Sequence, residues 1–391
     1  MIAPRRTEER AEGRLLRTAA FDLTRKLSRI NWFFVLLVVV LGGVGALSLY
    51  SATGSIDPYA TRQLVRFAAG FALMLAIALV DIRLIARLAW PFYAIALVLL
   101  ALVLKFGSVG LGAERWLSIG GIAVQPSEFM KVALVLALAH WFHRASWERV
   151  GNPFFLLPPL IAILAPVALI LKEPNLGTAL IVAALGGTIF FAAGVRLWKF
   201  ALVLVLGGLA APIAYAHLHG YQKQRILTFL NPARDPLGAG YNIIQAKIAL
   251  GSGGLWGQGL MHASQGRLDF LPEKETDFIF TLFAEQFGFV GSLALIVLLG
   301  LIVFMAGAIA LSSRHQFGRV VAFGLGMNFF LYVFVNLAMV MGLIPVGGVP
   351  LPLVSYGGSA LLTTMAAFGI LLSVHLHRDA DFTPKREAGS L

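Results

Sequence analysis

The 391-residue chain is too apolar for a soluble globular protein. Hydrophobic residues make up 59% of the sequence and charged residues 13%, and the mean hydropathy is +0.83. A soluble protein of this size could not keep so much apolar surface away from water. The sequence has no cysteine, which excludes disulfides, iron–sulfur clusters and cysteine-ligated zinc. The formal net charge of +12 is better explained by membrane orientation than by nucleic-acid binding.

Residues 1–30 are predicted to form a cytoplasmic basic tail in front of the first apolar run. That run starts after Asn31 and is too long for the apolar core of a signal peptide, so it indicates a membrane anchor. Within the tail, apolar residues recur at helical spacing from Leu16 to Ile30 among arginines and lysines, which is typical of an amphipathic helix on the inner leaflet. For residues 1–14 a disordered basic tail explains the sequence equally well.

Ten apolar runs approach or reach the roughly 20 residues that a helix needs to cross a bilayer. They cover residues 32–50, 64–81, 88–105, 128–142, 154–171, 176–195, 198–216, 278–311, 318–343 and 358–376. The runs are continuously apolar rather than alternating. We therefore expect an all-α polytopic membrane protein with about ten transmembrane helices.

The distribution of basic residues indicates how these spans are oriented. Ten spans place both termini on one side, and that side holds 19 of the 31 Lys and Arg residues, with a basic pair in every short connection. Because positive charge is retained on the inner side of a membrane, both termini are predicted to be cytoplasmic. We expect a membrane domain over 31–376 in the cytoplasmic (inner) membrane, a large extracytoplasmic loop over 217–277 and a cytoplasmic tail over 377–391.

The first outer segment that is richer than a simple connection runs from residue 110 to residue 131. Arg115 and Trp116 come first, and Ser127 is a plausible start for the next helix. Glu128 and Lys131 are spaced so that they can pair on one helix face. One interpretation is a polar pocket in which Arg115 and Lys131 meet an anionic phosphate, and the other is a structural ion pair. The ion pair is favoured for Glu128, and the two interpretations are balanced for Arg115 and Lys131.

Within the long loop, residues 225–229 and 243–250 have apolar side chains at helical spacing, with Lys247 among them. This pattern predicts helices that lie at the membrane interface or re-enter the membrane. The run GSGGLWGQGL over 251–260 fits neither a P-loop nor the dinucleotide-binding glycine motif. Tight turning of the backbone near lipid is the simpler explanation.

The loop ends in Asp277, which directly precedes the eighth apolar run and lies near Lys274. A carboxylate at this boundary between water and lipid is a candidate general base. The alternative is an acid that stabilises the first turn of a helix, and the sequence alone slightly favours this alternative. Glu285, two turns further on, is either a second polar member of a cavity or a partner for a basic residue.

The third outer segment, residues 336–359, is dominated by glycine and proline. Irregular backbone at membrane depth is tolerated only where protein buries it or where it lines a cavity. This segment is therefore predicted to be re-entrant or to form a cavity wall.

Four motifs in this order resemble the SEDS family, named for shape, elongation, division and sporulation. They are GAERWL with QPSEFMK (112–131), GAGYNIIQAKIALGSGGLWGQGL (238–260), LPEKETDFIF with EQFGFVG (271–291) and NLAMVMGLIPVGGVPLPLVSYGGS (336–359). Within the family they are more similar to RodA, the elongation polymerase, than to FtsW, its division counterpart. The matching pieces extend from about residue 30 to residue 376.

The resemblance implies an inverting peptidoglycan glycosyltransferase. It would polymerise lipid II, the undecaprenyl-diphosphate-linked disaccharide-pentapeptide, into glycan strands at the extracytoplasmic face during cell elongation. Asp277 matches the essential acid of the family, and Trp116, Glu128 and Lys131 match its polar cavity. Further substrate contacts are expected from Arg115, Lys247, Lys274, Glu285 and Ser355.

The implied partners are membrane lipids and a class B penicillin-binding protein, a single-span transpeptidase; nucleic acid is not expected. A divalent cation, Mg²⁺ or Mn²⁺, is the candidate cofactor for balancing the diphosphate charge. No metal ligand is assigned, because the close histidine pairs lack carboxylates at metal spacing.

Two positions depart from the family pattern, and two other functions stay open. Asn175 occupies a position that is often acidic, with Glu173 as a possible substitute, and Glu275 replaces a frequent histidine. A lipid II flippase would need a polar path to the cytoplasmic face, which the short inner connections do not indicate. A non-catalytic scaffold of the wall-synthesis complex would not need an acid at position 277.

Overall fold

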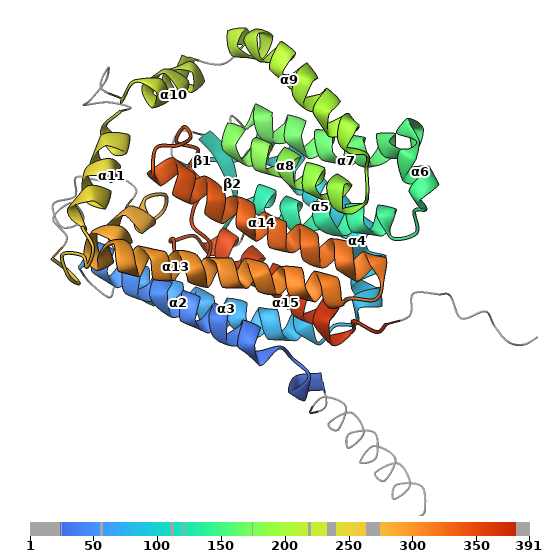
Figure 1. Ribbon diagram of the computed structural model, residues 1–391, viewed down its shortest axis with the longest axis horizontal. Helices are drawn as coiled ribbons and strands as arrows, with labels where there is room; N and C mark the ends of the chain where they lie inside the picture. The colour runs from blue at the N-terminus through green and yellow to red at the C-terminus, as the bar shows by residue number, and fades with distance from the viewer. Residues whose placement is uncertain are drawn as a thin grey trace, which may run out of the picture.

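The computed structural model describes Thr24 and residues 26–54, 58–110, 113–119, 122–173, 175–217, 220–232, 240–262 and 274–380. Most of the predicted N-terminal tail, the C-terminal tail from residue 381 and the loop over 263–273 lie outside the described residues. The described part is a bundle of long helices, and its layers can be followed in Figure 1.

All ten predicted spans are helices. They are α2 (Trp32–Thr53), α3 (Tyr59–Ala78), α4 (Ile82–Phe106), α5 (Pro126–Phe142), α7 (Pro153–Lys172), α8 (Leu176–Ala192), α9 (Leu197–His217), α13 (Ile279–Ser312), α14 (Gln316–Val340) and α15 (Gly358–Leu376). Among the described helices, seven are long and apolar enough to cross a membrane: α2, α3, α4, α7, α13, α14 and α15. Helix α8 and the apolar stretch Leu197–Ala210 of α9 are shorter, and α5 has 17 residues.

Polar side chains at the helix starts explain where several of these helices begin. Asn31, Asp81, Asn152 and Asn175 each accept a hydrogen bond from a main-chain N–H in the first turn of α2, α4, α7 and α8. His315 does the same for α14. These bonds satisfy donors that have no partner inside the helix.

Helix α5 is the centre of the bundle and is buried along most of its length. It packs against α4, α14, α8 and α7, while α3 lies along α15 and α13 lies along α14 and α2. Glycine permits the closest approaches between membrane helices. A methyl group on Gly45 would lie 2.2 Å from the carbonyl oxygen of Leu353, and one on Gly369 would lie 2.6 Å from that of Met74.

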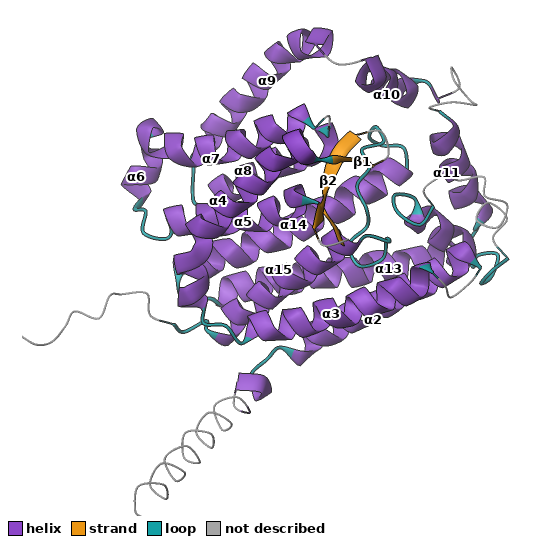
Figure 2. Cartoon of the chain, turned by 180° about the vertical axis from the view of Figure 1, so that it is seen from behind, coloured by secondary structure: helices purple, strands orange, loops and turns teal. Residues whose placement is uncertain are grey.

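Helix α9 leads away from the bundle, and α10 (Gly220–Leu230) and α11 (Tyr241–Ser252) bring the chain back to it, as Figures 1 and 2 show. The described side chains of α9 are exposed except for Lys199 and Phe200, which are half-buried, as expected for an apolar helix that faces lipid. The helices predicted within the long loop are confirmed as α10 and α11. A short helix, α6 (Trp147–Gly151), precedes α7.

A small antiparallel sheet, which the sequence analysis did not predict, occupies the 108–124 segment. It consists of β1 (Ser108–Gly110), β2 (Ala113–Ile119) and β3 (Ile122–Val124) in the order β1-β2-β3 (Figure 2). Ser359 at the start of α15 joins it to the bundle, because its Oγ donates to the Ala123 carbonyl and accepts from the Gln125 N–H, both at 3.2 Å. The all-α class still describes the protein, with this sheet as an addition.

Helix α13 is broken at Gly288, whereas the sequence analysis predicted one continuous span. Gly288 has φ 66° and ψ −163°, a conformation that favours glycine. The glycine-rich run 251–260 fills the break. The N–H groups of Gln258 and Gly259 donate to the carbonyls of Glu285 and Gln286, and the N–H of Phe289 donates to the carbonyl of Gly254. The predicted turn in this run thus supplies hydrogen-bond partners for the main-chain groups that the break in α13 leaves unpaired.

The irregular backbone between α14 and α15 is buried in the bundle, which confirms the prediction for this segment. Leu351, Leu353 and Val354 are almost completely buried. Leu353 has φ +63° although it is not glycine. Since such a conformation costs about 1–3 kcal/mol, the surrounding contacts must hold it in place.

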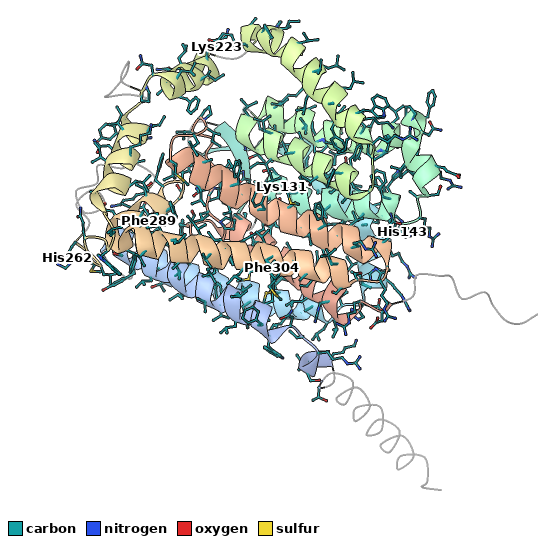
Figure 3. All side chains as sticks on the ribbon, viewed as in Figure 1. Lys131, His143, Lys223, His262, Phe289 and Phe304 are labelled. Carbon is teal, nitrogen blue, oxygen red and sulfur yellow. The ribbon has the colours of Figure 1, made fainter. Side chains whose placement is uncertain are left out.

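The basic connections gather at the opposite end of the bundle, where Figure 3 labels His143. There the N–H of Arg314 donates to the Arg378 carbonyl at 3.1 Å, and Ser373 Oγ donates to the Val80 carbonyl at 2.7 Å. Arg314 also forms an ion pair with Asp379 at 3.1 Å. The start of α2 and the end of α15 lie at this same end (Figure 1).

Candidate functional site

Asp277 belongs to a turn over residues 274–278 that leads directly into α13. The residue is 8% exposed. A methyl group on Gly348 would lie 3.6 Å from Oδ2 of Asp277, so the carboxylate lies beside the Gly347–Gly348 backbone. Gly348 has φ +66°, and a residue with a side chain would be strained in this backbone conformation.

Three consecutive carbonyl groups of this turn accept hydrogen bonds from the α14–α15 region. The N–H of Tyr356 donates to Glu275 O at 2.8 Å, Ser355 Oγ donates to Thr276 O, and Asn336 Nδ2 donates to Asp277 O at 2.9 Å. Segments that are distant in sequence therefore fix the backbone at Asp277.

The hydroxyl of Ser355, which was predicted to contact substrate, is engaged by the main chain. It accepts from the N–H of Leu351 at 2.8 Å and donates to the carbonyl of Thr276. This arrangement supports the turn that carries Asp277 rather than leaving the hydroxyl for a ligand.

Lys274 and Glu285 are buried like Asp277, whereas Glu275 in the same turn is half-buried. Lys274 lies in the same turn, and Glu285 lies on the first half of α13 and is 0% exposed. Thr281 and Gln286 are buried on this half-helix as well. Ionisable groups in membrane helices face the protein interior or a cavity, and this half of α13 follows that rule.

Glu128 and Lys131 form a buried ion pair on the first turns of α5. The distance from Lys131 Nζ to Glu128 Oε1 is 2.7 Å. Tyr332 of α14 donates its hydroxyl to the same oxygen at 2.7 Å, and Nζ lies 4.0 Å from the centre of the Tyr332 ring. Figure 3 shows Lys131 inside the bundle. The predicted pairing is confirmed, and a role for Lys131 toward substrate stays a prediction.

Three residues that were predicted to contact substrate lie elsewhere around the bundle. Arg115 and Trp116 are neighbours on β2; the side chain of Trp116 is half-buried, and that of Arg115 lies outside the described part. Lys247 lies on α11, where a methyl group on Gly342 would be 3.0 Å from its Nζ. It also lines a groove of about 430 Å³ between α10 and α11.

The departure at Asn175 preserves the local structure. Asn175 Oδ1 accepts from the N–H of Thr178 at 3.3 Å, a capping bond that an aspartate would also make. Glu173 is buried in the preceding turn. A methyl group on Gly177 would lie 2.8 Å from Gly347 O, which places this turn against the loop that reaches Asp277.

Three residues that the sequence analysis did not single out contribute to the site. Asn336 and Tyr332 lie one turn apart on α14. Asn336 donates to the main-chain carbonyl of Asp277, and Tyr332 donates to the carboxylate of Glu128. Arg66 of α3 lies over the Tyr356 ring, with Cζ 4.7 Å from the ring centre, and its Nη1 is buried without a hydrogen-bond partner among the described residues. A polar residue inside an apolar span was the available signal for all three.

The arrangement suits proton transfer at a membrane boundary. A carboxylate on a fixed turn can take a proton from a hydroxyl, and nearby arginine and lysine side chains can balance an anionic leaving group. Among the described residues, no three histidine or carboxylate side chains gather as metal ligands. Two of the close histidine pairs lie at helix ends, where His143 follows α5 and His377 follows α15.

Comparison with known proteins identifies the family. Residues 28–380 match the model of the FtsW/RodA/SpoVE family, described as cell cycle proteins. The chain is 42% identical to the peptidoglycan glycosyltransferase MrdB of Escherichia coli K12 over 349 residues, covering 88% of this chain and 93% of that protein. It is 37% identical to a probable peptidoglycan glycosyltransferase FtsW of Trichlorobacter lovleyi over 362 residues, covering 89% and 94%.

Solved structures show the same fold. A chain from a study of polymerisation and crosslinking by a peptidoglycan synthase complex matches with a TM-score of 0.76 and 32% identity, covering 90% of this chain and 99% of that one. The rod shape determining protein RodA of Thermus thermophilus matches with a TM-score of 0.69 and 30% identity, covering 90% and 98%. On sequence and on structure alike, this chain belongs to the FtsW/RodA/SpoVE family.

Proposed function

We propose that the protein is a peptidoglycan glycosyltransferase that polymerises lipid II into glycan strands. Its relatives include proteins named for this activity, and its fold matches a chain from a peptidoglycan synthase complex. We further propose that it resides in the cytoplasmic membrane, with Asp277 at the extracytoplasmic face. The clustering of basic connections at the other end of the bundle supports this orientation.

The observation that carries the mechanism is the position of Asp277. Its carboxylate lies beside Gly348, on a turn whose carbonyls are fixed from α14 and the loop that follows it. In the proposed reaction, Asp277 accepts the proton of the acceptor sugar's 4-hydroxyl. The oxygen forms a bond to the donor's anomeric carbon, and the bond from that carbon to the diphosphate breaks. Undecaprenyl diphosphate leaves through a transition state of oxocarbenium character.

The leaving diphosphate needs positive charge near it. Lys131 is paired with Glu128, and Lys247 lies beside Gly342 at the end of α14. Arg66 lies at the outer part of α3, and its guanidinium packs against Gly358 at the start of α15. We propose Arg66 as an additional contact to this diphosphate. A divalent cation, Mg²⁺ or Mn²⁺, stays a second proposed source of charge.

A class B penicillin-binding protein is the proposed partner. The match to a chain of a peptidoglycan synthase complex supports it, because such a complex couples polymerisation to crosslinking. A single-span partner would contact lipid-facing apolar side chains, which this chain presents along α13 at Phe289 and Phe304, labelled in Figure 3.

The decisive experiment is glycan-chain formation from lipid II by the purified protein, with and without the partner transpeptidase. The parent and Asp277→Glu, which keeps a carboxylate, are compared with Asp277→Asn. Loss of one general base costs about 10²–10⁴ in rate, so Asp277→Asn is expected to lose polymerisation by that factor. A parent rate in Asp277→Asn would remove Asp277 from this role.

The same assay separates the other two functions. A scaffold would leave polymerisation absent from the parent and from every variant. A flippase would move fluorescent lipid II across vesicle membranes without forming glycan chains. Chains formed by the parent and lost with Asp277→Asn would contradict both.

A further inference from the structure

Asn336 lies at a point where two chain segments next to Asp277 meet. It is 0% exposed, and both hydrogens of its side-chain nitrogen are used. Nδ2 donates to Asp277 O at 2.9 Å and to Val349 O at 2.7 Å. The Oδ1 atom has no hydrogen-bond partner among the described residues, so the amide is held by its two donated bonds.

These two acceptors belong to two different chain segments, both of which adjoin the Asp277 carboxylate. One is the carbonyl of Asp277 itself, and the other follows Gly348, the residue that lies against Oδ2. One amide group therefore sets the spacing between the turn that carries the carboxylate and the loop beside it. A shift of either carbonyl would move the carboxylate relative to the Gly348 backbone.

We infer that Asn336 is a positioning residue for Asp277. It holds the backbone of residue 277 outside α13 and keeps the carboxylate against the Gly347–Gly348 loop. The inference rests on the proposed function, in which Asp277 is the base.

The hydrogen bonds at the start of α13 show what Asn336 prevents. In a regular helix the carbonyl of Asp277 would accept from the N–H of Thr281, four residues on. Here Asn336 occupies that carbonyl, and the N–H of Thr281 donates to Phe278 O at 3.0 Å. Without the amide, α13 could extend over Asp277 and rotate its side chain away from Gly348.

The chemistry at this position calls for an amide. Two carbonyls need two donors from one group, and only the NH₂ of Asn or Gln supplies both without charge. Aspartate would direct carboxylate oxygens at the two carbonyls, and a serine would keep one donor at most. Alanine would remove both of these donated bonds, and the loss of a buried hydrogen bond costs about 1–3 kcal/mol.

The test is a kinetic comparison of Asn336→Ala and Asn336→Ser with the parent in the lipid II assay. A misplacement of about 1 Å can cost on the order of 10²-fold. We expect Asn336→Ala to lower kcat by about 10–100-fold, with a KM within about twofold of the parent. We expect the kcat of Asn336→Ser to lie between that of the parent and that of Asn336→Ala. The acid limb of the kcat–pH profile should shift in both variants.

A double-variant cycle separates positioning from a general loss of structure. If Asn336 acts through Asp277, Asn336→Ala lowers the residual rate no further in an Asp277→Asn background. A structural role would give the same fractional loss in both backgrounds. Ser373→Ala is the matched control, because it removes a comparable buried bond to a carbonyl at the far end of the bundle; it is expected to keep the parent rate.

Each outcome decides a separate claim. A parent-like kcat and pH profile in Asn336→Ser and Asn336→Ala would overturn the inference, as would equal losses in the two backgrounds. If Asn336→Ala does not fold, the double-variant cycle with Asp277→Asn is measured with Asn336→Ser and with Ser355→Ala instead. Ser355 is suitable because its hydroxyl donates to the carbonyl of Thr276, next to that of Asp277. A parent rate in Asp277→Asn would instead remove Asp277 from the role of general base in the proposed mechanism, whatever Asn336 does.

Discussion

Lys131 and Tyr332 converge on one oxygen atom of Glu128. The ammonium group and the phenol hydroxyl each lie 2.7 Å from Oε1, and the ammonium also lies over the phenol ring. A charge at this depth is stable only when it is paired and hydrogen-bonded. The three side chains together join α5 to α14 beneath the Asp277 turn.

Removing only the lysine from this group should destabilise the protein strongly. Lys131→Met leaves the Glu128 carboxylate buried without its counter-charge, which typically costs about 3–5 kcal/mol. The double variant Glu128→Gln/Lys131→Met keeps an acceptor for Tyr332 and removes both charges, so it should recover most of the lost thermal stability in detergent. Equal melting temperatures for the single and double variants would contradict this account.

Activity of the same double variant tests whether Lys131 touches substrate. A purely structural pair predicts that polymerisation recovers together with stability. A diphosphate contact predicts that stability recovers while KM for lipid II stays raised. Stability and KM of this one double variant therefore distinguish a structural ion pair from a phosphate contact, the two interpretations that the sequence left balanced for Lys131.

The break in α13 should not tolerate a side chain. A methyl group on Gly288 would lie 2.3 Å from the N–H nitrogen of Gly257, and the residue has a positive φ. Backbone strain of about 1–3 kcal/mol and overpacking of about 1–3 kcal/mol act together, so Gly288→Ala should lower the melting temperature markedly. A methyl group on Gly300 of the same helix would meet nothing within 4 Å. Gly300→Ala should therefore leave the melting temperature unchanged or raise it slightly. Similar effects of the two substitutions would show that the packing of the glycine run is unimportant.

The sequence was sufficient for the helices because their signal is local. An apolar run of about 20 residues specifies a membrane helix without reference to its neighbours, so all ten spans appear as helices. The break at Gly288 was missed because the sequence of α13 by itself does not predict it. It depends on hydrogen bonds from Gln258 and Gly259, residues that lie before the turn that carries Asp277.

The site was predictable only in part for the same reason. Asp277 and the Glu128–Lys131 pair lie in motifs where polar residues adjoin a span, so sequence position identified them. Asn336 was missed because its importance comes from two carbonyls on other segments. Ser355 was predicted to contact substrate, whereas its hydroxyl bonds to the main chain of Leu351 and Thr276.

Stability should fall as the basic end of the bundle is acidified. Burial lowers the pKa of His315 below its usual 6.5, and this effect outweighs the hydrogen bond to the His377 carbonyl, which raises the pKa; the charges of the His377 and Arg319 side chains lower it further. Its Nδ1 accepts from the N–H of Gly318, which requires the neutral ring. Because the folded-state pKa is below the unfolded value, this contribution is complete above about pH 6.5 and is lost as pH falls below it.

The measurement is the melting temperature of the parent and of His315→Asn between about pH 5.5 and 7.5. Asparagine also caps a helix but does not titrate, so its profile should be flatter over this range. His143, whose pKa burial also lowers, is unchanged in both proteins and contributes the same slope to each. Parallel profiles would show that His315 does not govern the acid sensitivity.

Arg66 should affect substrate binding more than turnover. Its guanidinium carries a buried N–H without a partner among the described residues, and the first N–H groups of α15 lie beside it, since Gly358 starts that helix and no side chain caps it. A hydrogen bond to a charged group is worth about 1.5–3 kcal/mol. Arg66→Gln is therefore expected to raise KM for lipid II by about 10–100-fold with little change in kcat. Arg66→Lys should recover part of this loss, because it keeps the charge without the fork of donors.

Arg62→Gln removes an equal charge from an exposed position one turn earlier and controls for general electrostatic attraction. If Arg62→Gln and Arg66→Gln raise KM equally, the effect is one of net charge and Arg66 makes no specific contact with the diphosphate.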